Sequence, residues 1–342
     1  MDGTGSRETV LLRGFLASAD ERALAGAAIR SGGLVVMPTE TVYGLAANAL
    51  DSLAVASIYV AKGRPSDNPL IVHVSSVSDV DRLCGPDRDA LDAARALFAR
   101  FSPGPLTLVL PRAKDIPLGV TAGLETVGIR IPSHPAALAL IDAAGVPLAA
   151  PSANRSGRVS PTTFAMACAE MDGRVDAIID GGDCQVGLES TVARVGHGIV
   201  SILRPGAVTE EMLAEALPGF SIVRSADLPV DPSAAAPSPG MRYAHYRPSA
   251  DVYCWKGGPI EAFADAEGLA VIGLVSDIGR VDAALRIGFS SVEEYAARFF
   301  AALAECDLAG ARVILAQAVP ETGIGAALMN RLVRAAAGRW VG

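Results

Sequence analysis

The sequence contains no closely spaced pair of cysteines, so it lacks the Cys-x-x-Cys signature of many zinc and redox sites. Its five cysteines are scattered along the chain, at Cys84, Cys168, Cys184, Cys254 and Cys306. A scattered, odd-numbered set is typical of reduced thiols inside the cell rather than of a disulfide framework. The four histidines also lack zinc-like spacing. We therefore predict no metal site built from protein ligands alone.

Long apolar runs and a signal peptide are missing too. No stretch reaches the roughly 18 apolar residues that a membrane span needs. The first ten residues, MDGTGSRETV, are polar and do not resemble a signal peptide. The sequence therefore predicts a cytoplasmic protein without a membrane partner.

The chain also lacks an excess of basic residues. Its net charge of −8 argues against nucleic acid as the main ligand, so any contact with a nucleotide or RNA requires a local basic cleft. Aromatic residues make up only 5% of the sequence and hydrophobic residues 51%, which predicts a folded core made mainly of aliphatic side chains. The length of 342 residues favours two domains.

Short apolar runs alternate with helical patterns along most of the chain, which predicts an α/β fold. The predicted strands cover residues 10–12, 34–37, 69–74, 106–110, 147–150, 175–180, 199–204 and 220–223, and a further strand carries Arg130. The predicted helices cover residues 21–31, 51–61, 87–100, 134–144, 162–171 and 208–216. We expect Asp20 to cap the first helix.

The last part of the chain reads as a smaller α/β unit without a catalytic constellation. Strands are predicted over 251–255, 269–275 and 312–316, and helices over 292–305 and 323–337. This alternation favours a mainly parallel sheet. We therefore divide the chain into an N-terminal arm (1–19), a larger α/β domain (20–224), a linker (225–249) and a C-terminal domain (250–342).

The linker changes character along its length. Its first half is rich in Pro, Ala and Ser, whereas its second half carries the bulky side chains Met241, Arg242, Tyr243, His245 and Tyr246. Such residues favour docking, either as a lid over a site or as packing between the two domains.

The stretch Gly33–Leu45, GLVVMPTETVYGL, is the first candidate site. Pro38 ends the apolar strand, because proline has no N–H to donate to a sheet. Thr39, Glu40 and Thr41 follow, where α/β sheets bind ligands beyond the carboxyl ends of their strands. A capped turn before a helix is the alternative, and this stretch alone does not decide between the two.

Polar residues follow other strands in the same way. PSAN (151–154) comes after one apolar strand, GLESTV (187–192) lies at another strand edge, and Arg204 ends a third strand. Two such strand ends lying side by side would form one site. Arg130 alternates with the apolar residues around it, so it points either into a cleft, where it could grip a carboxylate, or into solvent.

The loop AKGRPSDNPL (61–70) joins two cations to an amide on a segment broken by glycine and prolines. Lys62, Arg64 and Asn68 suit a polyphosphate, because the loop is charged and costs little to order. Solvated loop charges are the alternative. His73, on the strand that follows, is by itself more typical of a packed core residue than of a catalytic one.

Read together, the motifs form an ordered set. They are PTETVYGL (38–45), KGRPSDNPLIVH (62–73), SPGPLT (102–107), TAGLETVGIR (121–130), APSAN (150–154), ESTV (189–192), RPG (204–206) and PGMRYAHYRP (239–248). This set resembles the threonylcarbamoyl-AMP synthase family, whose catalytic module is the YrdC-like domain. The tail, with IGAALMNR (324–331), is similar to the extra C-terminal domain of the long, two-domain form. The resemblance implies an open twisted α/β sheet with a large concave cavity, plus a smaller Rossmann-like α/β domain.

The resemblance also implies an activity. Members of the family act as an L-threonylcarbamoyladenylate synthase, which is a nucleotidyltransferase. They make threonylcarbamoyl-AMP and pyrophosphate from L-threonine, bicarbonate or CO2, and ATP with its Mg²⁺. A partner transferase then places the threonylcarbamoyl group on tRNA. Two alternatives stay open: an RNA-binding YrdC-like module without catalysis, and carbamoyl transfer onto a protein. The second is disfavoured by the lack of a Cys-x-x-Cys pair.

Site residues follow from the resemblance by position. Those that look like the L-threonine set are Thr39, His73, Arg130 and Ser190. Those that look like the ATP set are Lys62, Arg64, Asn68, Thr126, Ser152, Asn154, Ser160, Arg204 and Tyr246. Lys62 and Arg64 are also the catalytic candidates, since they would neutralise phosphate charge. Gly63 departs from the family, because many relatives carry a larger residue there.

Overall fold

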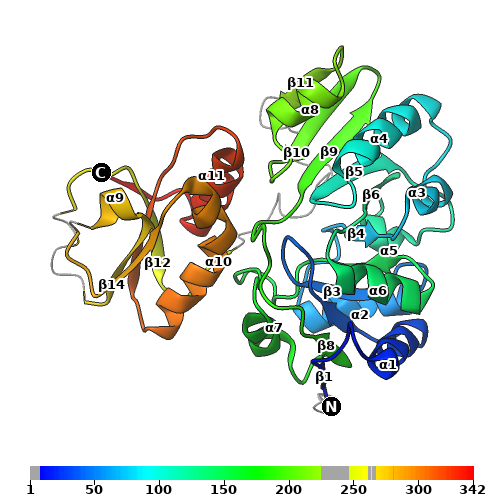
Figure 1. The fold of residues 1–342 in the computed structure, drawn as a ribbon, viewed down its shortest axis with the longest axis horizontal. Coiled ribbons are helices and arrows are strands. Elements are labelled where there is room, and N and C mark those ends of the chain that lie inside the picture. The colour runs from blue at the N-terminus through cyan, green and yellow to red at the C-terminus, as the bar shows by residue number, and fades with distance from the viewer. Residues whose placement is uncertain (1–7, 225–245, 261–262, 264–266, 280) are drawn as a thin grey trace.

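The computed structural model describes residues 8–224, 246–260, 263, 267–279 and 281–342. They form two β-sheets, each with its own helices (Figure 1). We call residues 8–224 the eleven-stranded part and the described residues from 246 to 342 the five-stranded part. This arrangement confirms the predicted α/β fold with a second, smaller sheet.

The eleven-stranded part has the strand order β1-β8-β2-β3-β7-β4-β6-β5-β9-β10-β11. Its strands are β1 (Val10–Leu12), β2 (Val35–Met37), β3 (Gly44–Asn48), β4 (Ile71–His73), β5 (Leu106–Pro111), β6 (Thr126–Arg130), β7 (Leu148–Ala149), β8 (Ala177–Ile179), β9 (Thr191–Gly196), β10 (Ile199–Arg204) and β11 (Ser221–Arg224). Pairing is mixed: β2 is parallel to β8, for example, but antiparallel to β3.

The helices of this part are α1 (Ala19–Arg30), α2 (Ser52–Lys62), α3 (Val77–Leu83), α4 (Arg88–Phe101), α5 (Leu118–Thr121), α6 (Pro135–Ala144), α7 (Phe164–Met171) and α8 (Glu210–Ala216). They cover both faces of the sheet. Val35 and Met37 of β2 pack in one apolar cluster with α1 and α6, whereas Val36 packs in a second cluster with α2 and α4. Alternation along the strand thus buries both faces of β2, which explains its continuous apolar sequence.

The five-stranded part is wholly parallel, as predicted, with the order β14-β13-β15-β12-β16. Its strands are β12 (Asp251–Trp255), β13 (Leu269–Leu274), β14 (Leu285–Phe289), β15 (Val313–Gln317) and β16 (Trp340–Val341). Its helices are α9 (Val275–Ile278), α10 (Val292–Leu308) and α11 (Ile324–Ala335). Ser291 caps α10 by accepting from the backbone N–H of Glu294, the predicted capping interaction.

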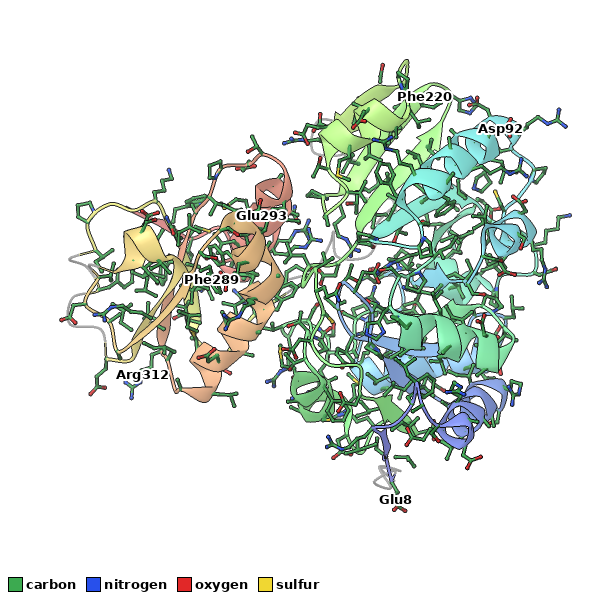
Figure 2. All side chains as sticks on the ribbon, in the orientation of Figure 1. Glu8, Asp92, Phe220, Phe289, Glu293 and Arg312 are labelled. Atoms are coloured by element: carbon green, nitrogen blue, oxygen red, sulfur yellow. The ribbon has the colours of Figure 1, made fainter. Side chains whose placement is uncertain are left out.

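Helices α10 and α11 lie on the side of the five-stranded part that faces the eleven-stranded part (Figure 1). Val42 and Leu188 of the eleven-stranded part share an apolar cluster with Phe300 of α10 and Leu328 of α11. Figure 2 shows the described side chains of both parts in the same orientation. The two parts therefore pack together directly.

Several local predictions were wrong or incomplete. Ser18, not Asp20, caps α1, because its hydroxyl accepts from the backbone N–H of Glu21. Strand β3 was not predicted, since its sequence GLAAN contains residues with little strand preference and is specified by pairing with β2 and β7. Helices α3, α5 and α9 and strands β9, β14 and β16 were also missed.

The N-terminal arm contains the predicted strand, and β1 pairs in parallel with β8. Its residues from Val10 onward therefore belong to the large sheet. Most of the predicted linker, including Met241, Arg242, Tyr243 and His245, lies outside the described residues. Within the described ranges, no helix combines the length and apolar character that crossing a membrane would demand.

Candidate functional site

One cleft brings together most of the predicted site residues. It is partly open to solvent and lies where the turn after β2 meets the ends of β4, β6, β7 and β10. The predicted residues that line it are Thr39, Lys62, Arg64, His73, Arg130, Ser152, Asn154, Ser160, Ser190, Arg204 and Tyr246. Two predicted residues, Asn68 and Thr126, do not line it.

The two polar strand ends lie side by side, as the sequence suggested. Gly44 forms an isolated antiparallel bridge with Ser152, and the backbone N–H of Ala153 donates to the carbonyl of Tyr43 at 2.8 Å. The segment after β2 and the PSAN segment after β7 therefore form one wall. A Cβ at position 44 would make ordinary van der Waals contacts with Ala150, Met37 and Pro151, so this wall is closely packed.

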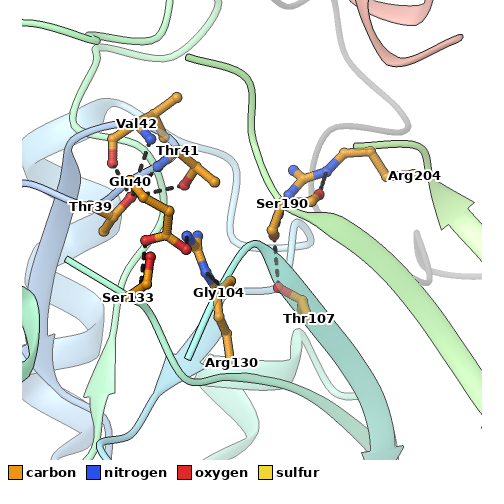
Figure 3. A network of polar contacts seen from close by, with 10 residues as sticks. All are labelled: Thr39, Glu40, Thr41, Val42, Gly104, Thr107, Arg130, Ser133, Ser190 and Arg204. Carbon is orange, nitrogen blue, oxygen red and sulfur yellow. Dashed lines mark hydrogen bonds and ion pairs between the residues drawn. The ribbon is translucent and has the colours of Figure 1, made fainter. Parts of the chain in front are cut away.

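Arg130 lies at one end of the cleft, and it is buried, with 4% of its surface exposed. Its Nη2 lies 2.8 Å from Oε1 of Glu40, and its Nε donates to the carbonyl of Gly104 at 3.4 Å (Figure 3). The ion pair is not aligned as a hydrogen bond, and Nη2 donates to no other described residue. Arg130 thus points into the cleft rather than into solvent, with hydrogen-bonding capacity left over.

Glu40 is the acid that compensates Arg130. Its Oε2 accepts from the backbone N–H of Ser133 at 3.1 Å. Burial works to raise the pKa of Glu40, but the nearby charge of Arg130, helped by the backbone N–H of Ser133, outweighs burial, so the pKa falls below its usual value. Glu40 is therefore ionised at neutral pH.

Two neutral groups complete this end. The hydroxyl of Thr39 accepts from the backbone N–H groups of Thr41 and Val42, both at 3.2 Å (Figure 3). His73 is buried, and its burial, together with the nearby charge of Arg130, lowers its pKa to about 3. His73 is therefore a neutral imidazole at physiological pH.

Ser190 lies opposite Arg130 and is held from two sides. Its hydroxyl lies 2.7 Å from that of Thr107 and accepts from Nη2 of Arg204 at 3.2 Å (Figure 3). Nε of Arg204 donates to the carbonyl of Ser190 at 3.1 Å. Burial, followed by the charge of Arg331, lowers the pKa of Arg204 to about 10, so Arg204 stays cationic.

Lys62 and Arg64 supply positive charge elsewhere in the cleft. Lys62 is the last residue of α2, and its ammonium donates to the carbonyls of Ser152 and Asn154. Burial, reinforced by Arg64, holds the pKa of Lys62 well below its usual value. Burial lowers the pKa of Arg64 to about 10, and its guanidinium donates to the carbonyls of Asn68 and Pro69.

The unusual Gly63 has a conformational reason. It caps the C-terminus of α2 in the left-handed region, with φ of 59° and ψ of 39°. Glycine adopts this conformation at little cost, which lets the chain turn sharply between Lys62 and Arg64. A Cβ at this position would meet nothing within 4 Å, so a larger residue is sterically possible in relatives.

Ser152, Asn154 and Ser160 provide polar atoms near Lys62. Ser152 donates to Oδ1 of Asn154 at 2.5 Å, and Nδ2 of Asn154 donates to the carbonyls of Arg155 and Arg158, both at 2.9 Å. Ser160 donates to Glu189 at 2.7 Å. Much of this wall is therefore already ordered by internal hydrogen bonds.

Tyr246 is the first described residue of the predicted linker (225–249), and it reaches the cleft. Only 5% of its surface is exposed, and its ring centroid lies 5.0 Å from that of Phe300. Its φ of 65° is rare for a residue other than glycine. The end of the linker therefore packs between the cleft and α10.

The two predicted residues outside the cleft lie close by. The main-chain carbonyl of Asn68 accepts from Tyr59 and Arg64, while its side-chain Oδ1 is buried without a hydrogen bond from the described residues. Thr126 lines a separate small cavity next to β4 and β6. Their assignment to ATP stays a prediction.

Three buried charged residues in or near the cleft were not predicted as site residues: Glu40, Glu189 and Arg331. Arg331 had a detectable signal, because it occupies a position on the apolar face of α11, between the buried Leu328 and Ala335. Glu189 and Glu40 lie inside the quoted motifs, but only the fold shows that both are buried. Among the described residues, no group of three or more His, Cys, Asp or Glu side chains is arranged to hold a metal ion.

Comparison with known proteins assigns both parts of the chain. A family model described as "Telomere recombination" (Sua5, YciO and YrdC) matches residues 27–206. A second, described as "Threonylcarbamoyl-AMP synthase, C-terminal domain", matches residues 208–337. The boundary between these models lies before α8, whereas the sheets divide after β11.

Relatives match nearly the whole chain. The threonylcarbamoyl-AMP synthase of Bacillus subtilis is 42% identical over 336 residues, with 93% of each chain covered. That of Pyrococcus abyssi is 42% identical over 322 residues, covering 91% of this chain and 93% of the relative. The crystal structure of P. abyssi Sua5 complexed with L-threonine matches with a TM-score of 0.86 and 39% identity, covering 97% of this chain and 98% of that one.

Proposed function

The chain belongs to the threonylcarbamoyl-AMP synthase family, and on that premise we propose that it joins L-threonine, bicarbonate or CO2, and ATP into threonylcarbamoyl-AMP and pyrophosphate. The observation that carries the proposal is the cleft itself. It combines a buried arginine with unused hydrogen-bonding capacity at one end and further cations on neighbouring segments. These are the groups needed for an amino-acid carboxylate and a triphosphate.

L-threonine would bind at the end of the cleft that holds Arg130. Arg130 lines the cleft, its Nη2 makes no aligned hydrogen bond to the described residues, and a guanidinium can bind a carboxylate through two parallel hydrogen bonds. The hydroxyls of Thr39 and Ser190 lie on either side of it, and neutral His73 adds no competing charge (Figure 3). The P. abyssi Sua5 complex with L-threonine supports this substrate.

ATP would place its phosphates against Lys62, Arg64 and Arg204. Ser152, Asn154, Ser160 and Tyr246 line the same cleft and are our candidates for further contacts to the nucleotide. The cations now donate to main-chain carbonyls. Phosphate oxygens would replace some of these carbonyls as stronger, charged acceptors.

The reaction needs no covalent enzyme intermediate. The neutral amine of threonine attacks the carbon of CO2 and loses a proton, or attacks the carbon of bicarbonate with loss of water, and forms a carbamate. A carbamate oxygen then attacks the α-phosphorus of ATP, and the bond to the bridging oxygen breaks, so that pyrophosphate leaves with the electron pair. Positioning and charge neutralisation supply most of the catalysis of such transfers. We assign the neutralisation to Lys62 and Arg64.

The cleft does not fit a magnesium site of its own, because Glu189, a buried carboxylate that lines it, is paired with Arg331, and the buried Glu40 near it is paired with Arg130. We propose that Mg²⁺ enters with ATP, held by phosphate oxygens and water, as this ion commonly is. No step is assigned to a protein-bound metal.

A carbamate decomposes in water, so a closed cleft would protect it. The end of the linker at Tyr246 is our candidate for part of that cover. The product would pass to a transferase that modifies tRNA, with only weak RNA contact by this chain.

The test is pyrophosphate release by the full chain with ATP, Mg²⁺ and bicarbonate, in the presence and absence of L-threonine. We expect release that requires both threonine and bicarbonate. Release without threonine would indicate a different transferase. Binding of RNA that weakens with salt, without pyrophosphate release, would replace the synthase with a non-catalytic RNA-binding module.

A further inference from the structure

Arg331 is a buried cation of the five-stranded part, and its side chain contacts the eleven-stranded part. It lies on α11, its side chain is fully buried, and it is the largest such side chain among the described residues. A buried charge is costly unless it is paired and hydrogen-bonded. The groups that pair with Arg331 therefore indicate which part of the structure it holds in place.

The guanidinium of Arg331 holds the ends of two neighbouring strands. Nε donates to Oε2 of Glu189 at 2.9 Å, and Nη2 donates to the carbonyl of Glu189 at 3.2 Å. Nη1 donates to the carbonyl of Pro205 at 2.6 Å and to Oδ1 of Asn330 at 3.2 Å. Glu189 lies two residues before β9, and Pro205 directly follows its antiparallel partner β10.

From Glu189 the contacts continue to residues that line the cleft. Its Oε1 accepts from the hydroxyl of Ser160 at 2.7 Å. Burial works to raise the pKa of Glu189, but Arg331 and Arg204 bring it down to about 2, so Glu189 acts as a permanent acceptor for Ser160. Ser190, the next residue in the chain, faces the threonine end of the cleft.

Arg331 itself does not line the cleft. We propose that Arg331 is a positioning residue of the synthase: the five-stranded part holds Glu189 through it and thereby sets Ser160 in place for ATP. This inference rests on the proposed function. It differs from a purely structural role, because a purely structural contact would affect stability but not the balance between substrate binding and turnover.

The first experiment measures threonine-dependent pyrophosphate release at varied ATP for the wild type, Arg331→Met and Arg331→Lys. We expect Arg331→Met to raise the KM for ATP by roughly 10- to 100-fold, since small displacements of positioning groups have effects of this size. The kcat should change less. Lysine keeps the charge but not the three-way donor geometry. The KM of Arg331→Lys for ATP should therefore lie between those of the wild type and Arg331→Met.

Arg298→Met is the matched control. Arg298 lies on α10 of the same part, is half-exposed, pairs with Glu294 one helical turn away at 3.6 Å, and lies over the ring of Phe289 at 5.6 Å. It should leave the KM for ATP within about twofold of the wild type, since exposed pairs contribute little. An unchanged KM for ATP in folded Arg331→Met would overturn the proposal.

A second experiment tests whether the pair acts as a unit. Glu189→Gln is compared with Arg331→Met and with the double variant. Arg331→Met leaves a buried, unpaired carboxylate, and Glu189→Gln removes that charge while keeping an acceptor for Ser160. The double variant should therefore bind ATP more tightly than Arg331→Met alone. Losses that simply multiply would overturn the proposal, as would a double variant that is no better.

The two proposals fail in different ways. A wild type that releases no threonine-dependent pyrophosphate contradicts the synthase reaction, whatever Arg331 does. In that case calorimetric titration of ATP into the same variants still tests the positioning role. Weaker ATP binding in Arg331→Met, partly restored in the double variant, would support it, and equal binding in all variants would overturn it.

Discussion

Two buried arginine–glutamate pairs border the cleft, and the two arginines differ in the hydrogen bonds they make. Arg130 and Glu40 lie within the eleven-stranded part, and Nη2 of Arg130 donates no aligned hydrogen bond to the described residues. Arg331 reaches across from the five-stranded part, and its Nε, Nη1 and Nη2 all donate. Burial and pairing are common to both. Unused donor capacity separates an arginine that can receive a ligand from one that holds structure.

The largest effect is expected at the ligand-facing pair. Arg130→Met should lower kcat/KM for L-threonine roughly 30- to 5000-fold, which corresponds to about 2–5 kcal/mol. The reason is that the change removes the proposed partner of the threonine carboxylate and leaves Glu40 unpaired. Thermal unfolding with and without L-threonine checks the cause: threonine should raise the Tm of the wild type but not of this variant. An equal shift in both would show that Arg130 does not bind the substrate and would remove the contrast between the pairs.

Arg331→Met should show the converse pattern. Breaking a buried pair costs about 3–5 kcal/mol of stability, because an uncompensated charge remains inside. Urea unfolding should therefore show a large loss of unfolding free energy, while L-threonine still raises the Tm of the folded variant. Loss of the threonine response together with stability would mean that the two pairs act on one site rather than on two.

Acid should weaken the Glu189 pair in a defined pH range. The pKa of Glu189 is lowered from 4.5 to about 2, so its stabilising effect is complete above pH 4.5 and disappears as the pH falls through 2. The wild type should exceed Glu189→Gln in unfolding free energy by a margin that shrinks by about 3 kcal/mol over this range. Urea titrations at pH 7, 4.5, 3 and 2 measure this margin. A constant difference would indicate that Glu189 is not an ionised partner of Arg331.

Gly63→Ala provides the smallest expected effect and a baseline for the other variants. Its φ of 59° disfavours a Cβ, at a cost of roughly 1 kcal/mol, but a Cβ would touch nothing within 4 Å. Chemical denaturation should show this modest loss, with pyrophosphate release close to that of the wild type. A loss of activity as large as that of Arg130→Met would mean that the turn between Lys62 and Arg64 is as sensitive as the buried pairs.

Local sequence patterns identified most of the elements and most of the cleft. Pro38 and Gly63 mark where a strand and a helix end, because the backbone chemistry of each residue acts within a few positions. The same holds for the polar groups after β2 and β7, which the structure places side by side. The family motifs added the assignment of these groups to substrates, which stays a proposal residue by residue.

Other features depend on which distant segments meet. The residues of β3 have little strand preference of their own, and the pairing with β2 and β7 decides their conformation. The sequence around Arg130 was equally consistent with a side chain in a cleft and with one in solvent. Only the fold shows that Glu40 lies beside it. Arg331 and Glu189 lie 142 positions apart.

Composition and the order of motifs thus determined the α/β class, the two-part organisation and the family. Only the tertiary structure decided which buried charges are compensated, and by which partner. The physical reason is that the free energy of a buried charge depends on the few atoms within hydrogen-bonding distance. In this protein those atoms come from parts of the chain that no local pattern connects.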